Sequence, residues 1–304
     1  MNSPDPAQGR REPDTTQSGR ILTPGTTRQE LERINHRPVT KLGQNFLVDG
    51  NIVRKSLQMA EIGPDDRVVE IGPGLGTLTH ALLETGATVQ AIEFDRIHHQ
   101  HLEASISPEL ASRLTLKQGD AVREPLAGLP DPEALPFKIV ANLPYAISTP
   151  WLSGILEGPL PSRMVLMLQA ETAARLTATH GSKDFGAISI VLQSAYRPAG
   201  KHRVSRNCFH PRPEVASALI RLDLRSDPIR LHLASKTLIR QFFRNRRKQI
   251  GSLLKAVPTA LSTPFLARLE TAGLSTQTRP EAIPLELWQD FDRLVRMAGS
   301  IDEE

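Results

Sequence analysis

The sequence predicts an α/β fold in which a doubly wound parallel sheet is followed by a small all-helical domain. Short apolar segments typical of strands alternate with helix-like segments between residues 67 and 224. From residue 225 onward the apolar residues recur only with helical spacing. Alternating strands and helices favour parallel pairing, because parallel neighbours need a crossover connection.

The elements are predicted in chain order from these patterns. Residues 1–38 are rich in Pro, Gly, Thr and charge, and we expect a mostly disordered tail. Helices are expected over 51–62, 79–86, 95–106 and 235–256. Strands are expected over 67–72, 88–93, 113–120, 137–142, 163–168, 187–196 and 217–224. We therefore assign residues 39–224 to the sheet domain and residues 225–304 to the helical domain.

Composition excludes several classes of protein. Cys208 is the single cysteine, which excludes a disulfide framework and a cysteine metal cluster. No apolar run approaches the roughly 18–20 residues of a membrane span, and the N-terminus lacks the apolar core of a secretion signal. The net charge is +4, but residues 225–255 hold nine Lys or Arg and one acid. This stretch suits a polyanion such as RNA, although on charge alone a solvated helix face is the favoured explanation.

The predicted strands end in polar or glycine-rich residues, and the carboxyl ends of such strands form the ligand site in open α/β sheets. The first ends in a loop with Gly72, Gly74 and Gly76, the second in Glu93, the third in Asp120 and the fourth in Asn142. The loop departs from the dinucleotide fingerprint, because Thr77 stands where the third glycine is required.

The nature of these side chains suggests a ligand. A carboxylate about 20 residues after a glycine loop can accept two ribose hydroxyls, which assigns Glu93, and Asp120 suits an adenine amino group. The loop holds no basic residue for phosphates. Each signal alone is weak, since strand-end acids are often helix caps. Together they predict a positively charged nucleoside, and S-adenosylmethionine, with its sulfonium, is such a ligand.

The segment Asn142-Leu143-Pro144-Tyr145 supplies the predicted chemistry. An adenine amine is a poor nucleophile because its lone pair is delocalised into the ring. Acceptors for its two N–H groups, the Asn142 side-chain oxygen and a backbone carbonyl beside Pro144, would favour a more tetrahedral nitrogen. Tyr145 offers a ring on which an unstacked base can lie. Catalysis would then be positioning and electrostatics, without a covalent nucleophile.

The motifs KLGQNFL (41–47), VEIGPGLGTLT (69–79), IEFD, QGDA, NLPYAIST and FHPRPEVASALIRL (209–222) occur in this order. As a set they resemble the ribosomal RNA adenine dimethyltransferases, and within that family the bacterial enzymes of the small subunit. The resemblance covers about residues 38–290. It implies a Rossmann-like methyltransferase sheet and dimethylation of N6 of two adjacent adenosines in the 3′-terminal hairpin loop of 16S rRNA, late in small-subunit assembly.

The resemblance also implies site residues beyond those found from strand ends. The donor positions it implies are Asn45, Leu47, Gly72, Glu93, Asp120 and Asn142; Gly74 of the glycine loop is added to this set. Phe46 and Phe209 are expected near the target base, and Arg246, Arg247 and Lys248 are expected to contact the RNA backbone. The partner is the small ribosomal subunit or its precursor; we expect a monomer in the cytoplasm, with no membrane association.

Three alternatives remain open. An antibiotic-resistance methyltransferase acting on 23S rRNA would carry a similar glycine loop and acids. A non-catalytic assembly or transcription factor could share the fold, although the intact acids and NLPY segment argue against lost catalysis. A DNA amino-methyltransferase would need a target-recognition region that the sequence lacks. For the HHQH segment (98–101) a solvated helix face is favoured over a metal site, so no metal is predicted.

Overall fold

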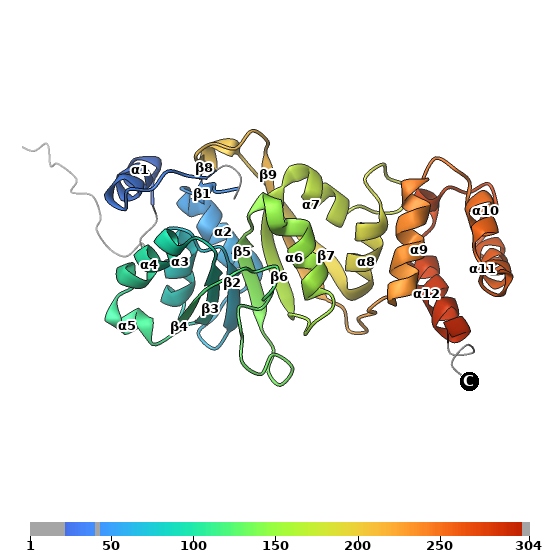
Figure 1. Ribbon diagram of the computed structural model, residues 1–304, viewed down its shortest axis with the longest axis horizontal. Coiled ribbons are helices and arrows are strands. Elements are labelled where there is room, and N and C mark those ends of the chain that lie inside the picture. Colours follow the sequence, from blue (N-terminus) through green and yellow to red (C-terminus); the bar gives the residue numbers. More distant parts are fainter. Residues whose placement is uncertain (1–21, 40–42, 300–304) are drawn as a thin grey trace, which may run out of the picture.

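The computed structural model describes residues 22–39 and 43–299, and a seven-stranded sheet forms its centre. The strands lie side by side in the order β4-β3-β2-β5-β6-β9-β7 (Figure 1). The strands are β2 (Arg67–Ile71), β3 (Thr88–Glu93), β4 (Leu114–Gln118), β5 (Lys138–Asn142), β6 (Arg163–Gln169), β7 (Tyr196–Val204) and β9 (Ser217–Leu224). A separate two-stranded sheet joins β1 (Phe46–Leu47) to β8 (Phe209–His210).

Helices cover both faces of the sheet, as a doubly wound fold requires. The helices are α1 (Pro24–Arg33), α2 (Gly50–Ala60), α3 (Thr77–Glu84), α4 (Arg96–Ser105), α5 (Pro108–Ala111), α6 (Ser148–Ile155), α7 (Ala170–Leu176), α8 (Ala187–Ala195), α9 (Leu233–Arg244), α10 (Ile250–Leu253), α11 (Thr259–Thr271) and α12 (Leu285–Gly299). On one face Val53 of α2 and Leu82 of α3 pack with Val68. On the other face Trp151 of α6 packs with the neighbouring Val69. Adjacent strand residues thus enter opposite cores, which is the period of two expected for a buried strand.

The sheet is mixed, so the prediction of a parallel sheet is wrong at one end. Strands β4, β3, β2, β5 and β6 run parallel, whereas β9 is antiparallel to both β6 and β7. The connection from β7 to β9 contains only a short turn and β8. Without a crossover helix, neighbouring strands can pair only antiparallel.

The predicted strand over 187–196 is instead helix α8. An apolar run of this length fits a buried helix as well as a buried strand, and periodicity alone does not separate them. Here the helix lies between the sheet and the C-terminal helices (Figure 1), and Ile190, Leu192 and Ala195 are all buried. The true strand, β7, follows it. It escaped detection because it is a sheet edge that carries Pro198 and several cations, and it is irregular between Pro198 and Gly200.

The helical unit after Leu224 is built around aromatic side chains. Phe242, Phe265, Trp288 and Phe291 are buried with ring centroids 4.8 to 6.1 Å apart. The predicted single helix over 235–256 is interrupted at residues 245–249. The amide of Ile250 donates to Thr278 and that of Gly251 donates to Thr276, so neither is available to continue helix α9.

The first described segment also departs from prediction, because residues 22–39 include helix α1 rather than a disordered tail. Thr23 caps the helix by accepting a hydrogen bond from the amide of Thr26. Leu22 and Leu31 are buried in a cluster with Phe46 and Leu75, and Ile34 packs against this cluster, so a few apolar side chains help to dock a polar helix. The remainder of the predicted tail, residues 1–21, lies outside the described residues. Within the described parts of the chain, no helix is long and apolar enough to cross a membrane.

Candidate active site

A cavity of about 370 Å³ lies at the carboxyl ends of β2, β3, β4 and β5. This is the topological switch point of the sheet, because the chain continues from β2 to β3 and β4 on one side and from β5 to β6 on the other. Among the described residues that line the cavity, none is Lys or Arg. The lining includes every residue predicted for the donor site and for catalysis: Asn45, Phe46, Leu47, Gly72, Gly74, Glu93, Asp120, Asn142, Leu143, Pro144 and Tyr145.

The glycine loop joins β2 to α3 and lies tightly against its neighbours. At Gly72 and Gly74 the backbone has φ values of +64° and +58°, which side chains rarely adopt. A Cβ at Gly74 would lie 3.1 Å from the ring of Phe46, and one at Gly72 would lie 3.2 Å from Pro144. Glycine therefore permits both the turn and the close approach of the two opposite walls.

Glu93 ends β3 and is only 6% exposed. One carboxylate oxygen accepts a hydrogen bond from the amide of Gly74 at 2.9 Å, and the other accepts from the amide of Asp95 at 2.9 Å. These bonds fix the carboxylate beside the loop, while burial raises the pKa of Glu93. Each oxygen keeps a lone pair that can accept a ligand hydroxyl. Asp120 follows the end of the neighbouring strand β4 and also lines the cavity, and its Oδ1 accepts from the amide of Val122 at 2.9 Å.

Asn142 is the last residue of β5, and a neighbouring backbone group sets its orientation. Its Nδ2 donates to the carbonyl of Asn45 at 3.0 Å. Among the described residues its Oδ1 has no hydrogen-bond partner, so this acceptor is available to a ligand. Leu143 follows with its amide bonded to the carbonyl of Met167, and Pro144 restricts the next backbone angle.

Tyr145 lines the same wall of the cavity. Its hydroxyl group lies 2.5 Å from the hydroxyl of Ser217 in β9, which fixes the ring from its far end. Burial raises the pKa of Tyr145, so the phenol remains neutral near pH 7. A neutral ring anchored in this way is suited to stacking against a planar ligand.

The opposite wall comes from residues 43–47, far from the strand ends in sequence. Strand β1 pairs Phe46 with His210 and Leu47 with Phe209. The Phe46 ring meets the His98 ring edge-on, with centroids 5.1 Å apart. Strand-end reasoning alone does not find this wall, because only the tertiary structure brings the segment over the glycine loop.

Two titratable residues of the cavity lining, Glu70 and His98, were not predicted. Glu70 lies within β2 and is 1% exposed, and burial raises its pKa to about 8. The signal in the sequence is a carboxylate inside an otherwise apolar strand. His98 also lines the cavity and is buried, as is His101, so the interpretation of HHQH as a solvated helix face is wrong for these two.

The structure does not bring Phe209 to the cavity. Its ring is 4% exposed and lies in the same buried cluster as Leu47 and Leu219, so a contact with the target base stays a prediction. Arg246, Arg247 and Lys248 lie away from the cavity, in the break between α9 and α10. Arg246 is held by the carbonyl of Lys183 at 2.9 Å, whereas the other two are exposed.

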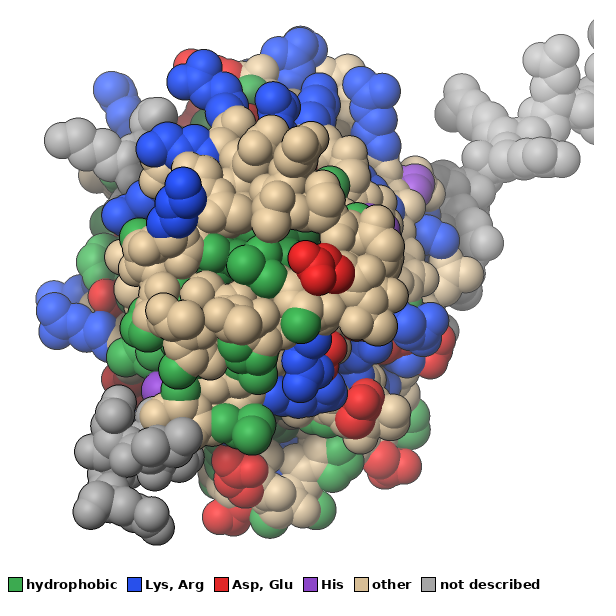
Figure 2. Space-filling view, turned by 90° about the vertical axis from the view of Figure 1, so that its right-hand side faces the viewer, with side chains coloured by type: hydrophobic (Ala, Val, Ile, Leu, Met, Phe, Trp, Pro, Cys, Tyr) green, Lys and Arg blue, Asp and Glu red, His purple; other side chains and the backbone are tan. Residues whose placement is uncertain are grey.

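A groove between the sheet domain and α9 is the second notable hollow. Its lining combines cations with two acids and includes Arg175, Lys183, Arg240, Arg244 and Arg246. Figure 2 looks onto the helical end of the molecule and shows Lys and Arg side chains gathered along the upper edge of that face. This arrangement suits a polyanion running across the junction.

Comparison with known proteins gives consistent relatives. The ribosomal RNA adenine dimethylase family matches residues 35–286. A protein from Opitutus terrae named ribosomal RNA small subunit methyltransferase A is 57% identical over 268 residues, covering 88% of this chain and 97% of the relative. The protein of the same name from Moorella thermoacetica is 37% identical over 290 residues, covering 91% and 99%.

Solved structures share the fold. A dimethyladenosine transferase from Plasmodium falciparum aligns with a TM-score of 0.70 and 24% identity, covering 84% of this chain and 98% of its own. The 23S rRNA methyltransferase ErmE aligns with a TM-score of 0.61 and 25% identity, covering 83% of this chain and 100% of its own.

Proposed function

Because the chain belongs to the ribosomal RNA adenine dimethylase family, we propose that it transfers methyl groups from S-adenosylmethionine to N6 of adenosine in 16S rRNA. The target is the pair of adjacent adenosines in the 3′-terminal hairpin loop, each receiving two methyl groups late in assembly of the small subunit. The small subunit is favoured because the relatives with 57% and 37% identity carry its name, whereas ErmE, a 23S rRNA enzyme, is 25% identical.

The composition of the cavity wall is the main observation that supports this proposal. Buried Glu93 and half-exposed Asp120 face a glycine backbone, and no cation is present among the described lining residues. Such a wall disfavours a pyrophosphate and suits a nucleoside that carries a sulfonium. Glu93 would accept the ribose hydroxyls, Asp120 the adenine amine, and the backbone at Gly72 and Gly74 would lie along the rest of the donor. When bound, the donor supplies an activated methyl group.

The residues of the NLPY segment then act on the target base. Asn142 Oδ1 is available because Nδ2 is already bonded to Asn45. It would accept one N–H of the target amine, and the carbonyl of Leu143, held beside Pro144, would accept the other. The N6 lone pair forms the new N–C bond as the C–S bond breaks, the sulfur keeps that electron pair, and the amine releases a proton to water. Tyr145 would hold the base by stacking.

The basic groove and the exposed cations after α9 are assigned to the RNA. Arg247 and Lys248 project from residues 245–249, and Arg240, Arg244 and Arg246 line the groove next to them. Their charge would be neutralised by phosphates, which makes binding depend on salt concentration. We assign residues 225–304 to RNA contact and residues 39–224 to methyl transfer, in a monomer that works in the cytoplasm.

The test is transfer of labelled methyl groups to small subunits that lack the modification, with large subunits in parallel. The RNA is digested to nucleosides afterwards. N6,N6-dimethyladenosine from small subunits alone is the expected result, and Asn142→Ala serves as the control for enzyme-dependent label. Label in large subunits would assign the protein to the 23S rRNA enzymes. Donor binding without label in either subunit would favour a binding protein on the same fold.

A further inference from the structure

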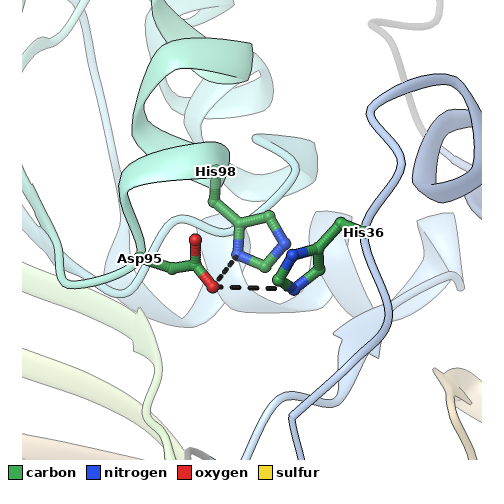
Figure 3. Close-up of side chains that lie close together, drawn as sticks. All are labelled: His36, Asp95 and His98. Atoms are coloured by element: carbon green, nitrogen blue, oxygen red, sulfur yellow. Dashed lines mark ion pairs between the residues drawn. The ribbon is translucent and has the colours of Figure 1, made fainter.

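Outside the catalytic segment, three potential metal ligands meet beside the cavity (Figure 3). His36 comes from the segment after α1, Asp95 precedes α4, and His98 lies in its first turn. Their nearest ligand atoms all lie within 4.8 Å of one another. None of the three has been used in the proposed methyl transfer.

The distances approach those of a metal centre. His36 Nε2 lies 3.5 Å from Asp95 Oδ2, and His98 Nδ1 lies 3.9 Å from the same oxygen. In a tetrahedral Zn²⁺ site with bonds of about 2.0–2.1 Å, ligand atoms lie about 3.3–3.4 Å apart. All three ligand atoms lie within 4.8 Å of one another, so metal binding requires the side chains to move closer together and the Gln44 amide to leave the space between them. Two imidazoles and one carboxylate also form a ligand set that Zn²⁺ commonly takes.

The cluster is buried and braced. The three side chains are between 1% and 12% exposed. Asp95 Oδ1 accepts from the amide of Ile97 at 2.9 Å, which fixes the carboxylate as the cap of α4 and leaves Oδ2 facing the histidines. His98 Nε2 is buried with no hydrogen-bond partner among the described residues. The bond to Asp95 Oδ1 is the kind of outer contact that orients a metal ligand in proteins, whereas the second ring nitrogen of His98 lacks one among the described residues.

Gln44 occupies the space between the three ligand atoms. Its Nε2 donates to Asp95 Oδ2 at 3.0 Å and lies 3.5 Å from His98 Nδ1, while its Oε1 lies 3.3 Å from His36 Nε2. A cation would replace the amide nitrogen as the partner of the carboxylate. Because Gln44 precedes Asn45 and Phe46 in the cavity wall, the cluster lies where that wall is joined to α4.

We propose that His36, Asp95 and His98 form a Zn²⁺ site that fastens the segment before Asn45 to α4. The metal would join two parts of the chain about 60 residues apart and brace the wall that carries Asn45, Phe46 and Leu47. The proposal concerns metal binding and local order, and it stands whether or not the methyl transfer proposed above is correct.

The test uses the full chain freed of metal with a chelator and then titrated with Zn²⁺. Competition with Co²⁺, whose visible absorption reports tetrahedral coordination, gives stoichiometry and affinity. We expect one Zn²⁺ per chain, and we expect His36→Ala and Asp95→Asn each to weaken binding at least about tenfold. Asp95→Asn preserves the helix cap, since Asn caps as well as Asp. His99→Ala, on the same helix but outside the cluster, is the matched control and should bind as the unmodified chain does.

Hydrogen exchange tests the fastening. Zn²⁺ should slow exchange of the amides in residues 34–39 and 43–47 in the unmodified chain and in His99→Ala, but not in His36→Ala. Absence of saturable Zn²⁺ binding, or equal binding by all variants, would overturn the site. Specific binding that leaves exchange in both segments unchanged would overturn the fastening role.

Discussion

Glu70 allows a quantitative test of the electrostatics of the cavity. Its carboxyl group lies inside β2 and is 1% exposed, and among the described residues its Oε2 has no hydrogen-bond partner. Burial raises the pKa to about 8 from an ordinary value of 4.5, a side-chain interaction with Thr79 partly opposes this rise, and the nearby charge of Glu93 adds to it. We predict that Glu70→Gln removes a pH dependence of the free energy of unfolding.

The sign follows from proton uptake. Between pH 4.5 and pH 8 the folded chain retains the Glu70 proton while the unfolded chain has lost it. The free energy of unfolding therefore falls as pH rises through this window, by at most about 1.4 kcal/mol per pH unit. Between pH 6 and pH 8 the contribution amounts to about 2 kcal/mol, allowing for partial ionisation near the folded pKa. The glutamine variant does not titrate and lacks this loss.

The assay is urea unfolding of both chains at pH 6, 7 and 8 without donor. At each pH the free energy of unfolding of the variant is compared with that of the unmodified chain. The measured quantity is how this difference changes with pH, because any pH-independent effect of the amide then cancels. Glu84→Gln, on the exposed side of α3, is the control for exchanging a carboxyl for an amide. A difference that stays constant across this range, or that shifts in favour of the unmodified chain as pH rises, would refute the reasoning.

Three further predictions concern ligand binding. Asn142→Ala should lower turnover more than donor affinity, because it removes an acceptor for the target amine. Single-turnover kinetics and donor titration check this prediction. Equal losses of turnover and donor affinity would assign Asn142 to the donor site. Gly74→Ala should destabilise the chain by about 1–2 kcal/mol through its positive φ. It should also weaken donor binding by displacing the Phe46 ring, and urea unfolding with donor titration would detect both effects. Replacing Arg247 and Lys248 by Ala should reduce the slope of log affinity for small-subunit RNA against log salt by up to about two, whereas an unchanged slope would exclude phosphate contacts.

Local pattern was sufficient for much of the fold. The predicted carboxyl ends of two strands, Glu93 and Asn142, are the observed ones. These ends are predictable because a buried strand is a short apolar run that is followed by turn residues. The predictions failed where tertiary packing, rather than the local sequence pattern, decides the secondary structure. The apolar run 187–196 became a helix because helices surround it on the side away from the sheet, and β7 was missed because an edge strand needs no continuous apolar run.

His98 and His101 show that a local sequence pattern can also fail to predict whether a single side chain is buried. Their sequence suits a solvated face, yet residues 22–39 cover them from outside the sheet domain. That segment docks through a few apolar contacts, such as Leu31 against Leu75, and through polar contacts of Arg33 and His36, which composition does not reveal.

The sequence by itself determined the order of chemical groups along the strand ends: a glycine loop, two acids, then Asn142 with Pro144 and Tyr145. It could do so because parallel strands bring successive carboxyl ends to one edge, whatever the details of packing. Only the tertiary structure decided what closes the cavity. Phe46 reaches the glycine loop through pairing with β8, and His36 reaches α4 through the docking of a distant segment. Contacts between parts of the chain remote in sequence depend on how the whole surface packs, which no local pattern records.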